Sequence, residues 1–319
     1  MSFAGERITE EDVLRAAAAA PAAAPVRITP LAARLAAELG IALDDIEGPA
    51  AIRVRAADLL RAAAAAEAAA PATAPMDGGH RLLDFATGEV RKLNRVRRIT
   101  AERMTTAAQT APQVTYTTRV DMTAAVGLRA QLKETAAARG VRLTYDAMFV
   151  RAAATALLEF PEVNARWVEG EGIALSAEAH VGVAVDLGGE GLIVPVVRNA
   201  HARGLLGLAG EVERLVDLAR EGRLGPDDYK GGTFTVTNLG LFGIEAFTPI
   251  VNLPEAAILG VGAIVPTPVY VGDELVKRQM ATLSLTADHR IVDGAPAARF
   301  LARIKALMEE PLLLLEKGF

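Results

Sequence analysis

Cysteine is absent from the 319-residue sequence, and aromatic residues are scarce at 4%. The first absence excludes a disulfide framework, a thiolate metal site and a cysteine nucleophile. The four histidines show no ligand spacing, so no metal site is expected. Alanine supplies much of the 51% hydrophobic fraction. Because alanine buries little area, part of the chain is predicted to be helical yet poor in core.

An excess of positive charge and long apolar runs are missing too. The formal net charge is −5 and the pI is near 5.6, which argues against nucleic acid as a partner because phosphate binding needs clustered Lys and Arg. No run of about 20 apolar residues could span a membrane, and the start, MSFAGERITEED, is too acidic for a signal peptide. No Gly-rich phosphate loop is present. A cytoplasmic protein is expected.

A short repeat and two Ala/Pro tracts organise the first 90 residues. The pattern Arg-Ile-x-x-x-Asp-Val-Leu-Arg-Ala-Ala-Ala at 7–18 recurs with conservative changes at 53–64. The matched Arg and Asp positions favour duplication over chance similarity between alanine-rich helices. The Ala/Pro tracts lack the apolar area to fold. Residues 1–25 are therefore interpreted as a relic helix with a linker, and 65–90 as an Ala/Pro-rich linker.

Residues 26–64 are predicted to form a small all-α module. Thr29 can cap a helix that begins at Pro30 and ends near Gly40, and a second helix is predicted over 54–66. The first helix and the residues after it resemble the peripheral subunit-binding domain of 2-oxo acid dehydrogenase complexes. The usual Gly-rich loop is reduced to Gly-Pro-Ala-Ala at 48–51. Binding of partners through this module is therefore expected to be weak or selective.

From residue 91 onward, helical and strand patterns alternate irregularly. Apolar residues recur at helical spacing over 124–139, 144–160, 205–218 and 297–308. Strands are predicted over 179–187, 192–197, 234–237, 257–261 and 283–285, and Gly188-Gly189 joins the first two as in a hairpin. This mixed order predicts one domain over 91–319, an α/β sandwich and not a regular βαβ winding.

The most informative string is Asp-His-Arg-Ile-Val-Asp-Gly-Ala at 288–295, between a predicted strand and an apolar helix. Further characteristic strings stand at 191–198, 232–240, 247–252 and 257–261. Together they resemble the catalytic domain of dihydrolipoyl acyltransferases and the related chloramphenicol acetyltransferases. The resemblance covers about 95–319. It implies a chloramphenicol acetyltransferase-like sandwich of mixed sheet and helices.

The same resemblance implies the chemistry. The family transfers an acyl group from a dihydrolipoyl thioester to coenzyme A, which requires removal of a thiol proton near neutral pH. His289 is the expected general base, since imidazole with an unperturbed pKa of about 6.5 suits the task. Thr237 is expected to donate a hydrogen bond to the developing oxyanion, with Asn238 after it as structural support. Thr237 could instead be a strand residue whose hydroxyl is satisfied locally.

Asp293 stands four residues after His289. The spacing alone suggests a relay like that of a serine hydrolase. The resemblance implies instead that the aspartate holds an arginine near the start of the domain and so keeps the site in shape. Arg103 is the best match for that arginine, and Arg97 and Arg98 compete with it.

No lysine stands in the Asp-Lys-Ala type of turn that carries a lipoyl group. The lipoyl group is therefore expected from a domain that is not in this sequence. Coenzyme A is expected to bind in a channel. Phe242 and the residues around it favour an acetyl or a branched-chain acyl group over succinyl.

The resemblance also implies an assembly. The chain would form a homotrimer with His289 and Thr237 contributed by neighbouring subunits, and trimers would join into a cube of about 24 or a shell of about 60 chains. The leucines at 312–315 would dock on a neighbouring trimer or fold back on their own domain. Partners would be the 2-oxo acid decarboxylase/dehydrogenase and dihydrolipoyl dehydrogenase components. A catalytically vestigial scaffold and a free-standing acetyltransferase acting on a small acceptor remain the alternatives.

Overall fold

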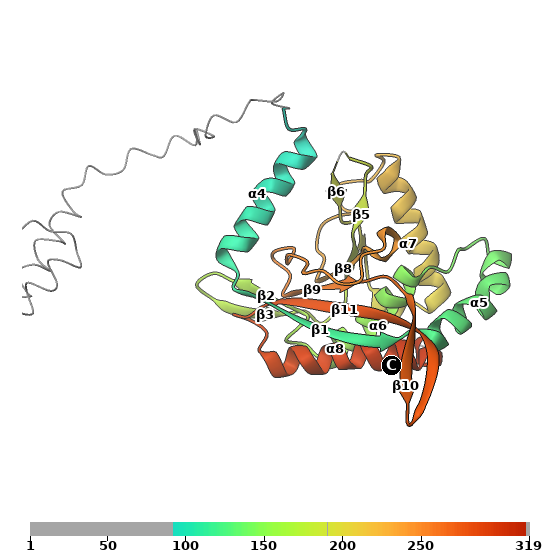
Figure 1. Ribbon diagram of the computed structural model, residues 1–319. Helices are drawn as coiled ribbons and strands as arrows, with labels where there is room; N and C mark the ends of the chain where they lie inside the picture. The colour runs from blue at the N-terminus through green and yellow to red at the C-terminus, as the bar shows by residue number, and fades with distance from the viewer. Residues whose placement is uncertain (1–91, 190, 317–319) are drawn as a thin grey trace, which may run out of the picture. The chain divides into compact units, whose positions relative to one another are not determined.

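The computed structural model describes residues 92–189 and 191–316, which belong to the unit Arg91–Phe319. The module expected at 26–64 and the tracts at 1–25 and 65–90 lie outside the described residues. Within them the chain is a mixed sheet with helices packed against it (Figure 1). The expected α/β class is confirmed.

A seven-stranded sheet forms the centre of the domain, in the order β1-β11-β9-β8-β4-β7, with β10 also paired to β11. The strand β8 runs parallel to β4 and β9, and the other pairs are antiparallel. Its strands are β1 (Gln113–Asp121), β4 (Val181–Val183), β7 (Val196–Val197), β8 (Phe234–Asn238), β9 (Ala257–Val261), β10 (Val265–Val271) and β11 (Glu274–Asp288). Two separate hairpins pair β2 (Ala165–Val168) with β3 (Gly172–Leu175) and β5 (Val185–Asp186) with β6 (Leu192–Ile193).

The helices of the described residues pack mainly around α6 and α8. The α-helices are α4 (Arg95–Thr110), α5 (Thr123–Ala138), α6 (Tyr145–Glu159), α7 (Leu205–Arg220) and α8 (Gly294–Glu309). The short 3₁₀ helices are η2 (Ala200–Ala202), η3 (Gly240–Phe242) and η4 (Pro311–Leu315). Helix α8 lies along β1, and α6 lies between α8 and α7 (Figure 1).

The four predicted helices are confirmed with ends shifted by at most three residues. The strand expected over 179–187 is divided into β4 and β5, which belong to different sheets. The short strand expected at 283–285 is the end of the 15-residue β11. Helix α4 was not predicted, because Ala107 is its only buried residue and it carries no apolar stripe.

Helix α6 is the centre of the core. Its first turn is capped by Thr144, whose Oγ1 accepts a hydrogen bond from the Ala147 N–H at 3.2 Å. Ten of its 15 residues are buried, and half of those are alanines. Small side chains let α7 and α8 pack closely on either side. The few aromatic residues concentrate here: the Phe300 ring meets the Phe160 and Phe234 rings edge-on, at centroid distances of 5.9 and 5.5 Å.

One charged residue of α6 holds the C-terminal segment. Arg151 is 2% exposed, and its guanidinium donates to the carbonyl oxygens of Leu314, His201 and Glu316. No carboxylate pairs with it among the described residues, and burial lowers its pKa. Backbone carbonyls at the ends of η2 and η4 therefore replace a counter-ion. Arg151 fixes where the chain leaves α8 and η4.

The 3₁₀ helix η4 presents two faces. Pro311 and Leu314 are buried, whereas Leu312 and Leu315 are 68% and 43% exposed. Side chains three residues apart lie above one another in a 3₁₀ helix, so each pair shares a face. The leucine run is thus divided: part of it folds back on its own domain, and two leucines form an outward apolar face.

Replacing Arg151 with Met should lower the free energy of unfolding by about 2–4 kcal/mol, because three carbonyl acceptors would lose their donor while the volume is roughly kept. Urea denaturation would measure it. Arg303→Met is the matched control, since Arg303 makes an exposed ion pair with Glu159 at 2.9 Å and should cost less than about 1 kcal/mol. Equal losses in the two variants would contradict the role assigned to Arg151.

Candidate active site

His289 lies in the loop between β11 and α8, and hydrogen bonds hold the main chain at His289 and at the residue before it. The His289 N–H donates to the Pro112 carbonyl at 2.8 Å. The preceding residue, Asp288, donates its N–H to Ala256 at 2.9 Å, and its carbonyl accepts from Ile291 and Val292, both at 3.0 Å. The His289 side chain itself is 42% exposed. A partly exposed imidazole is therefore presented on a rigid turn.

Asp288 and Arg290 brace this turn from both sides of His289. Asp288 is fully buried, and its carboxylate accepts from the Arg290 main-chain N–H at 3.0 Å and from Nη2 at 2.6 Å. The hydrogen bond to Asp288 raises the pKa of Arg290. The guanidinium also stacks on Trp167, 5.0 Å from the ring centroid. Sequence reasoning missed this brace, although the Asp-His-Arg string contained it.

Asp293 occupies the N-cap position of α8 and its side chain is 84% exposed. Its Oδ1 lies 3.8 Å from Nδ1 of His289, which is too long for a hydrogen bond. A relay from Asp293 to His289 is thus not formed in the single chain. Among residues 92–189 and 191–316 no ion pair joins Asp293 to Arg103, Arg97 or Arg98, so the pairing with Arg103 stays a prediction.

Thr237 lies at the end of β8, opposite Gly260 of β9. A Cβ on Gly260 would lie 2.9 Å from Cζ of Phe247, so the Phe247 ring packs over the glycine. Registered neighbours point their side chains to the same face of a sheet. The Phe247 ring is therefore on the side of the sheet where Thr237 points, a wall that the sequence pattern did not reveal.

Asn238 fixes the turn that follows Thr237. Its Oδ1 accepts from the Gly240 N–H at 2.8 Å, and its Nδ2 donates to Asp146 of α6 at 2.7 Å. Burial raises the pKa of Asp146, and the hydrogen bond from Asn238 partly offsets that shift. The strand end that carries Thr237 is thus tied to the core helix.

The structure does not bring Thr237 and His289 together in one chain. Thr237 is opposite Gly260, and Gly260 is opposite Ser284 of β11, five residues before His289. At roughly 3.4 Å per residue and 4.8 Å between strands, the two residues are separated by roughly 17 Å along the sheet and 10 Å across it. A site that uses both needs a second chain.

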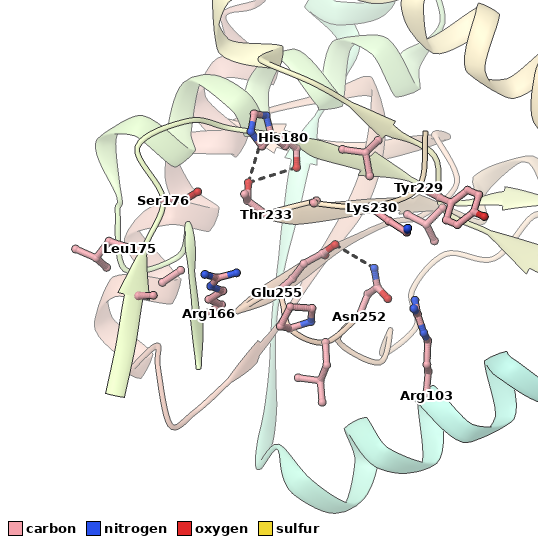
Figure 2. A pocket seen from close by; sticks show the side chains of 18 residues that line it. Arg103, Arg166, Leu175, Ser176, His180, Tyr229, Lys230, Thr233, Asn252 and Glu255 are labelled. Carbon is pink, nitrogen blue, oxygen red and sulfur yellow. Dashed lines mark hydrogen bonds between the residues drawn. The ribbon is translucent and has the colours of Figure 1, made fainter. Parts of the chain in front are cut away.

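A cavity of about 460 Å³ is lined by Glu255, Asn252 and Thr233 (Figure 2), and it lies toward the His289 end of the sheet because Ala256, next to Glu255, accepts from the Asp288 N–H. Glu255 lies in the cavity wall and is only 3% exposed. Its Oε2 accepts from Thr235 Oγ1 at 2.6 Å and its Oε1 from Asn252 Nδ2 at 3.0 Å. Burial raises the pKa of Glu255 to about 8. A Cβ on Gly232 would lie 2.8 Å from Oε1, so the glycine makes room for this carboxyl.

Three exposed cations line the same cavity. Arg103 reaches it from α4, Arg166 from β2, and Lys230 from the loop before β8 (Figure 2). None of the three forms an ion pair with Glu255 among the described residues. The buried carboxyl is therefore held by neutral donors while cations lie around the mouth of the cavity. Neither Glu255 nor Arg166 was expected from the sequence pattern as part of a site.

Residues 86–316 match the family described as 2-oxoacid dehydrogenases acyltransferase (catalytic domain). The chain belongs to this family. It is 44% identical over 221 residues to the dihydrolipoyllysine-residue acetyltransferase component of the acetoin cleaving system of Bacillus subtilis, across 69% of this chain and 55% of that protein. It is 40% identical over 220 residues to the lipoamide acyltransferase component of the branched-chain alpha-keto acid dehydrogenase complex of Pseudomonas aeruginosa, across 69% and 51%.

Solved structures agree with this membership. The dihydrolipoamide acetyltransferase of Azotobacter vinelandii has a TM-score of 0.70 at 37% identity, over 72% of this chain and 95% of that one. The cubic core of a pyruvate dehydrogenase multienzyme complex has a TM-score of 0.70 at 36% identity, over 77% and 100%. The chain spans about half the length of the curated relatives it matches. Among the residues that the structure describes, no helix is long and apolar enough to cross a membrane.

Glu255→Gln should stabilise the protein increasingly as the pH rises from 5 to 8. The folded state keeps the Glu255 proton up to about pH 8, whereas the unfolded chain releases it near 4.5. The wild type therefore loses stability over this interval, by up to a few kcal/mol, and the neutral amide lacks that loss. Melting temperatures of both proteins at pH 5, 7 and 9 would test this. A difference between them that stays constant with pH would count against the raised pKa.

Proposed function

We propose that the chain transfers an acyl group from a dihydrolipoyl thioester to coenzyme A, as the core of a 2-oxo acid dehydrogenase complex. The observation that carries the proposal is the rigidly held but exposed imidazole of His289 in a chain of this family. The names of the relatives, which are acyltransferase components of such complexes, support it. The lipoyl group would arrive on a domain outside the given sequence.

His289 acts as the general base. Its imidazole removes the proton of the coenzyme A thiol, and the thiolate attacks the thioester carbonyl. The tetrahedral intermediate places negative charge on the former carbonyl oxygen, and the Thr237 hydroxyl donates a hydrogen bond to it. One such donor contributes on the order of 3 kcal/mol. The intermediate then expels the dihydrolipoyl thiolate, which recovers a proton from the imidazolium.

Asp293 and Arg103 keep the site in shape, as a pair between a residue of the catalytic loop and one of α4. The Asp293 side chain is 84% exposed and its carboxylate makes only a 3.8 Å contact with His289, so an arginine can reach it. Arg103 lines the cavity in the single chain (Figure 2), and no ion pair joins it to Asp293 among the described residues. Formation of the Asp293–Arg103 pair therefore requires either a movement of α4 or the contact of α4 with another subunit in the assembly.

The site is shared between neighbouring subunits of a trimer. Thr237 and His289 stand at different ends of the sheet in one chain, and both are needed near one thioester. A cyclic trimer brings the Thr237 end of one chain to the His289 end of the next, and does so three times. Acetyl and branched-chain acyl groups fit the Phe247 wall better than a charged succinyl group.

A mixing experiment tests the shared site. His289→Ala and Thr237→Ala should each be nearly inactive, the first with kcat lowered by roughly 10²–10⁴. Trimers reassembled from an equal mixture should recover about a quarter of the wild-type turnover, since each mixed trimer contains one site with both groups intact. Transfer from acetyl- and isobutyryl-dihydrolipoamide would be followed, with succinyl-dihydrolipoamide compared for specificity.

The single variants mixed without reassembly are the control. A mixture that stays as inactive as its parents after reassembly would show that one chain holds the whole site. A His289→Ala protein with wild-type turnover would overturn the assignment of the base and favour a vestigial scaffold.

Trimers join further through the outward face of η4. Leu312 and Leu315 lie on one face near the chain end, where polar residues are usual. Burial of each would contribute about 1.5–3 kcal/mol. A cubic core among the similar structures supports a larger assembly. The remaining partners are the decarboxylase/dehydrogenase and dihydrolipoyl dehydrogenase components.

The double variant Leu312→Ser/Leu315→Ser should sediment as a free trimer that still transfers acyl groups, because the buried Leu314 and the core are untouched. This variant tests the outward face more specifically than a deletion of 312–319, which would also remove the buried Leu314. Leu175→Ser, at a 63% exposed leucine of β3, should leave the large assembly intact. Sedimentation velocity at micromolar concentration would measure the size of the assembly for each protein. A wild type that is already a lone trimer would refute the larger assembly.

A further inference from the structure

We propose that Glu255 is a positioning residue that holds the strand of Thr237 and the loop of His289 in place together, and that it thereby acts on two different active sites of the trimer. The proposal rests on the shared site described above. Glu255 is buried in the cavity wall (Figure 2), and neither its side chain nor its neighbours belong to the catalytic groups themselves.

The first connection runs to Thr237. Glu255 Oε2 accepts a hydrogen bond of 2.6 Å from Oγ1 of Thr235, which is itself 1% exposed. Thr235 and Thr237 are two residues apart on β8, so their side chains leave the same face of the strand roughly 7 Å apart. A fixed Thr235 hydroxyl therefore fixes the rotation of the strand that aims Thr237.

The second connection runs to His289 through the main chain. Glu255 directly precedes Ala256, whose carbonyl accepts from the Asp288 N–H at 2.9 Å. In the next position Ala257 is in register with Ala287 of β11. A displacement of Glu255 therefore reaches the residue before His289 through one peptide unit and one hydrogen bond.

A third contact links the loop of Glu255 to strand β1. Oε1 of Glu255 accepts from Asn252, and the adjacent Val251 donates its N–H to Oε1 of Gln113 at 2.9 Å. Gln113 is in register with Asp288. The loop that carries Glu255 is thus tied to the same point of β11 from a second strand.

The charges around Glu255 explain why its protonation state would change the position of its side chain. The titratable groups that line the cavity are Arg103 of α4, Arg166 of β2, His180 before β4, and Tyr229 and Lys230 before β8; Asp288 lies beyond Ala256. Arg166 forms an isolated main-chain β-bridge with Glu255, but none of these side chains makes an ion pair with the Glu255 carboxyl among residues 92–189 and 191–316. The hydrogen bonds from Thr235 and Asn252 by themselves favour the carboxylate, but burial outweighs them and keeps Glu255 as the acid at neutral pH. As a carboxylate, it gains by turning toward Arg103 or Arg166 and releasing Thr235, which would loosen both connections.

The test compares kcat for acyl transfer to coenzyme A in the wild type, Glu255→Gln and Glu255→Leu between pH 6.5 and 9.5. The neutral glutamine side chain can still form hydrogen bonds with Thr235 and Asn252. Glu255→Gln should therefore keep the wild-type kcat at pH 7, and its kcat should not fall as the pH rises above 8. The ratio of kcat for Glu255→Gln to wild type should rise about tenfold between pH 7 and 9. Leu should lower kcat at every pH, while KM for coenzyme A changes by less than about twofold.

Lys230→Gln is the control, because it removes a charge from the same cavity but touches neither connection. It should follow the wild-type profile. An alkaline loss that is identical in the wild type and Glu255→Gln would overturn the proposal. A wild type without any acyl transfer would instead overturn the proposed function, so the two failures are distinguishable. Melting curves show whether Glu255→Leu is folded, and Glu255→Gln carries the test if it is not.

Mixed trimers test the coupling to two sites. In a trimer of His289→Ala and Thr237→Ala chains, the rescued site takes Thr237 from the first and His289 from the second. Glu255→Leu is added to one parent at a time. Both combinations should lower the rescued turnover severalfold, because each loses one of the two connections. If only one combination lowers it, Glu255 serves one half of the site and the coupling is refuted.

Discussion

The pairing of β9 with its two neighbours is the constraint on which the rest of the site depends. This strand is parallel to β8 and antiparallel to β11, so the strands that lead to Thr237 and His289 run in opposite directions on either side of it. The end of β8 therefore lies away from the end of β11. Thr237 and His289 are placed at opposite ends of one sheet by backbone hydrogen bonds alone, so the second chain that the proposed site requires is a consequence of topology.

The same strand explains why small residues recur around it. Gly260 sits under the Phe247 ring, and a Cβ on Gly262 would lie 2.0 Å from the Glu245 carbonyl oxygen. Any side chain at these two positions would push the loop after β8 off the sheet. One of the strings that resembled the family in the sequence, 257–261, contains Gly260, and Gly262 follows it directly. Their spacing reflects the close approach of a loop to a strand and not any chemistry of glycine itself.

Sequence reasoning recovered the elements with strong periodicity and missed those without it. Helices α7 and α8 carry apolar stripes, and both were predicted. Strand β1 and the first half of β11 are rich in polar and charged residues, and the pairing of β1 with β11 joins segments far apart in sequence. His289 and Thr237 were predicted as site residues from local strings, because each lies in a turn or strand with a distinctive sequence around it. No local string marked Glu255 as a site residue. It stands out only in the structure, because it is buried and accepts a hydrogen bond from Thr235, 20 residues earlier in the chain.

Two buried ionisable groups, Arg151 and Glu255, show how this protein uses charge away from the catalytic residues. Neither has a counter-ion among the described residues, and each is satisfied by groups that exist only in one backbone arrangement. A buried charge that is paired with another side chain can follow it when the structure shifts. A guanidinium held by carbonyls, or an acid held by a threonine and an asparagine, loses its partners when the backbone moves, at a cost of about 1–3 kcal/mol for each unsatisfied group. Such groups therefore penalise alternative positions of the segment they hold: the outward leucines of η4 in one case, and the two strand ends of the site in the other.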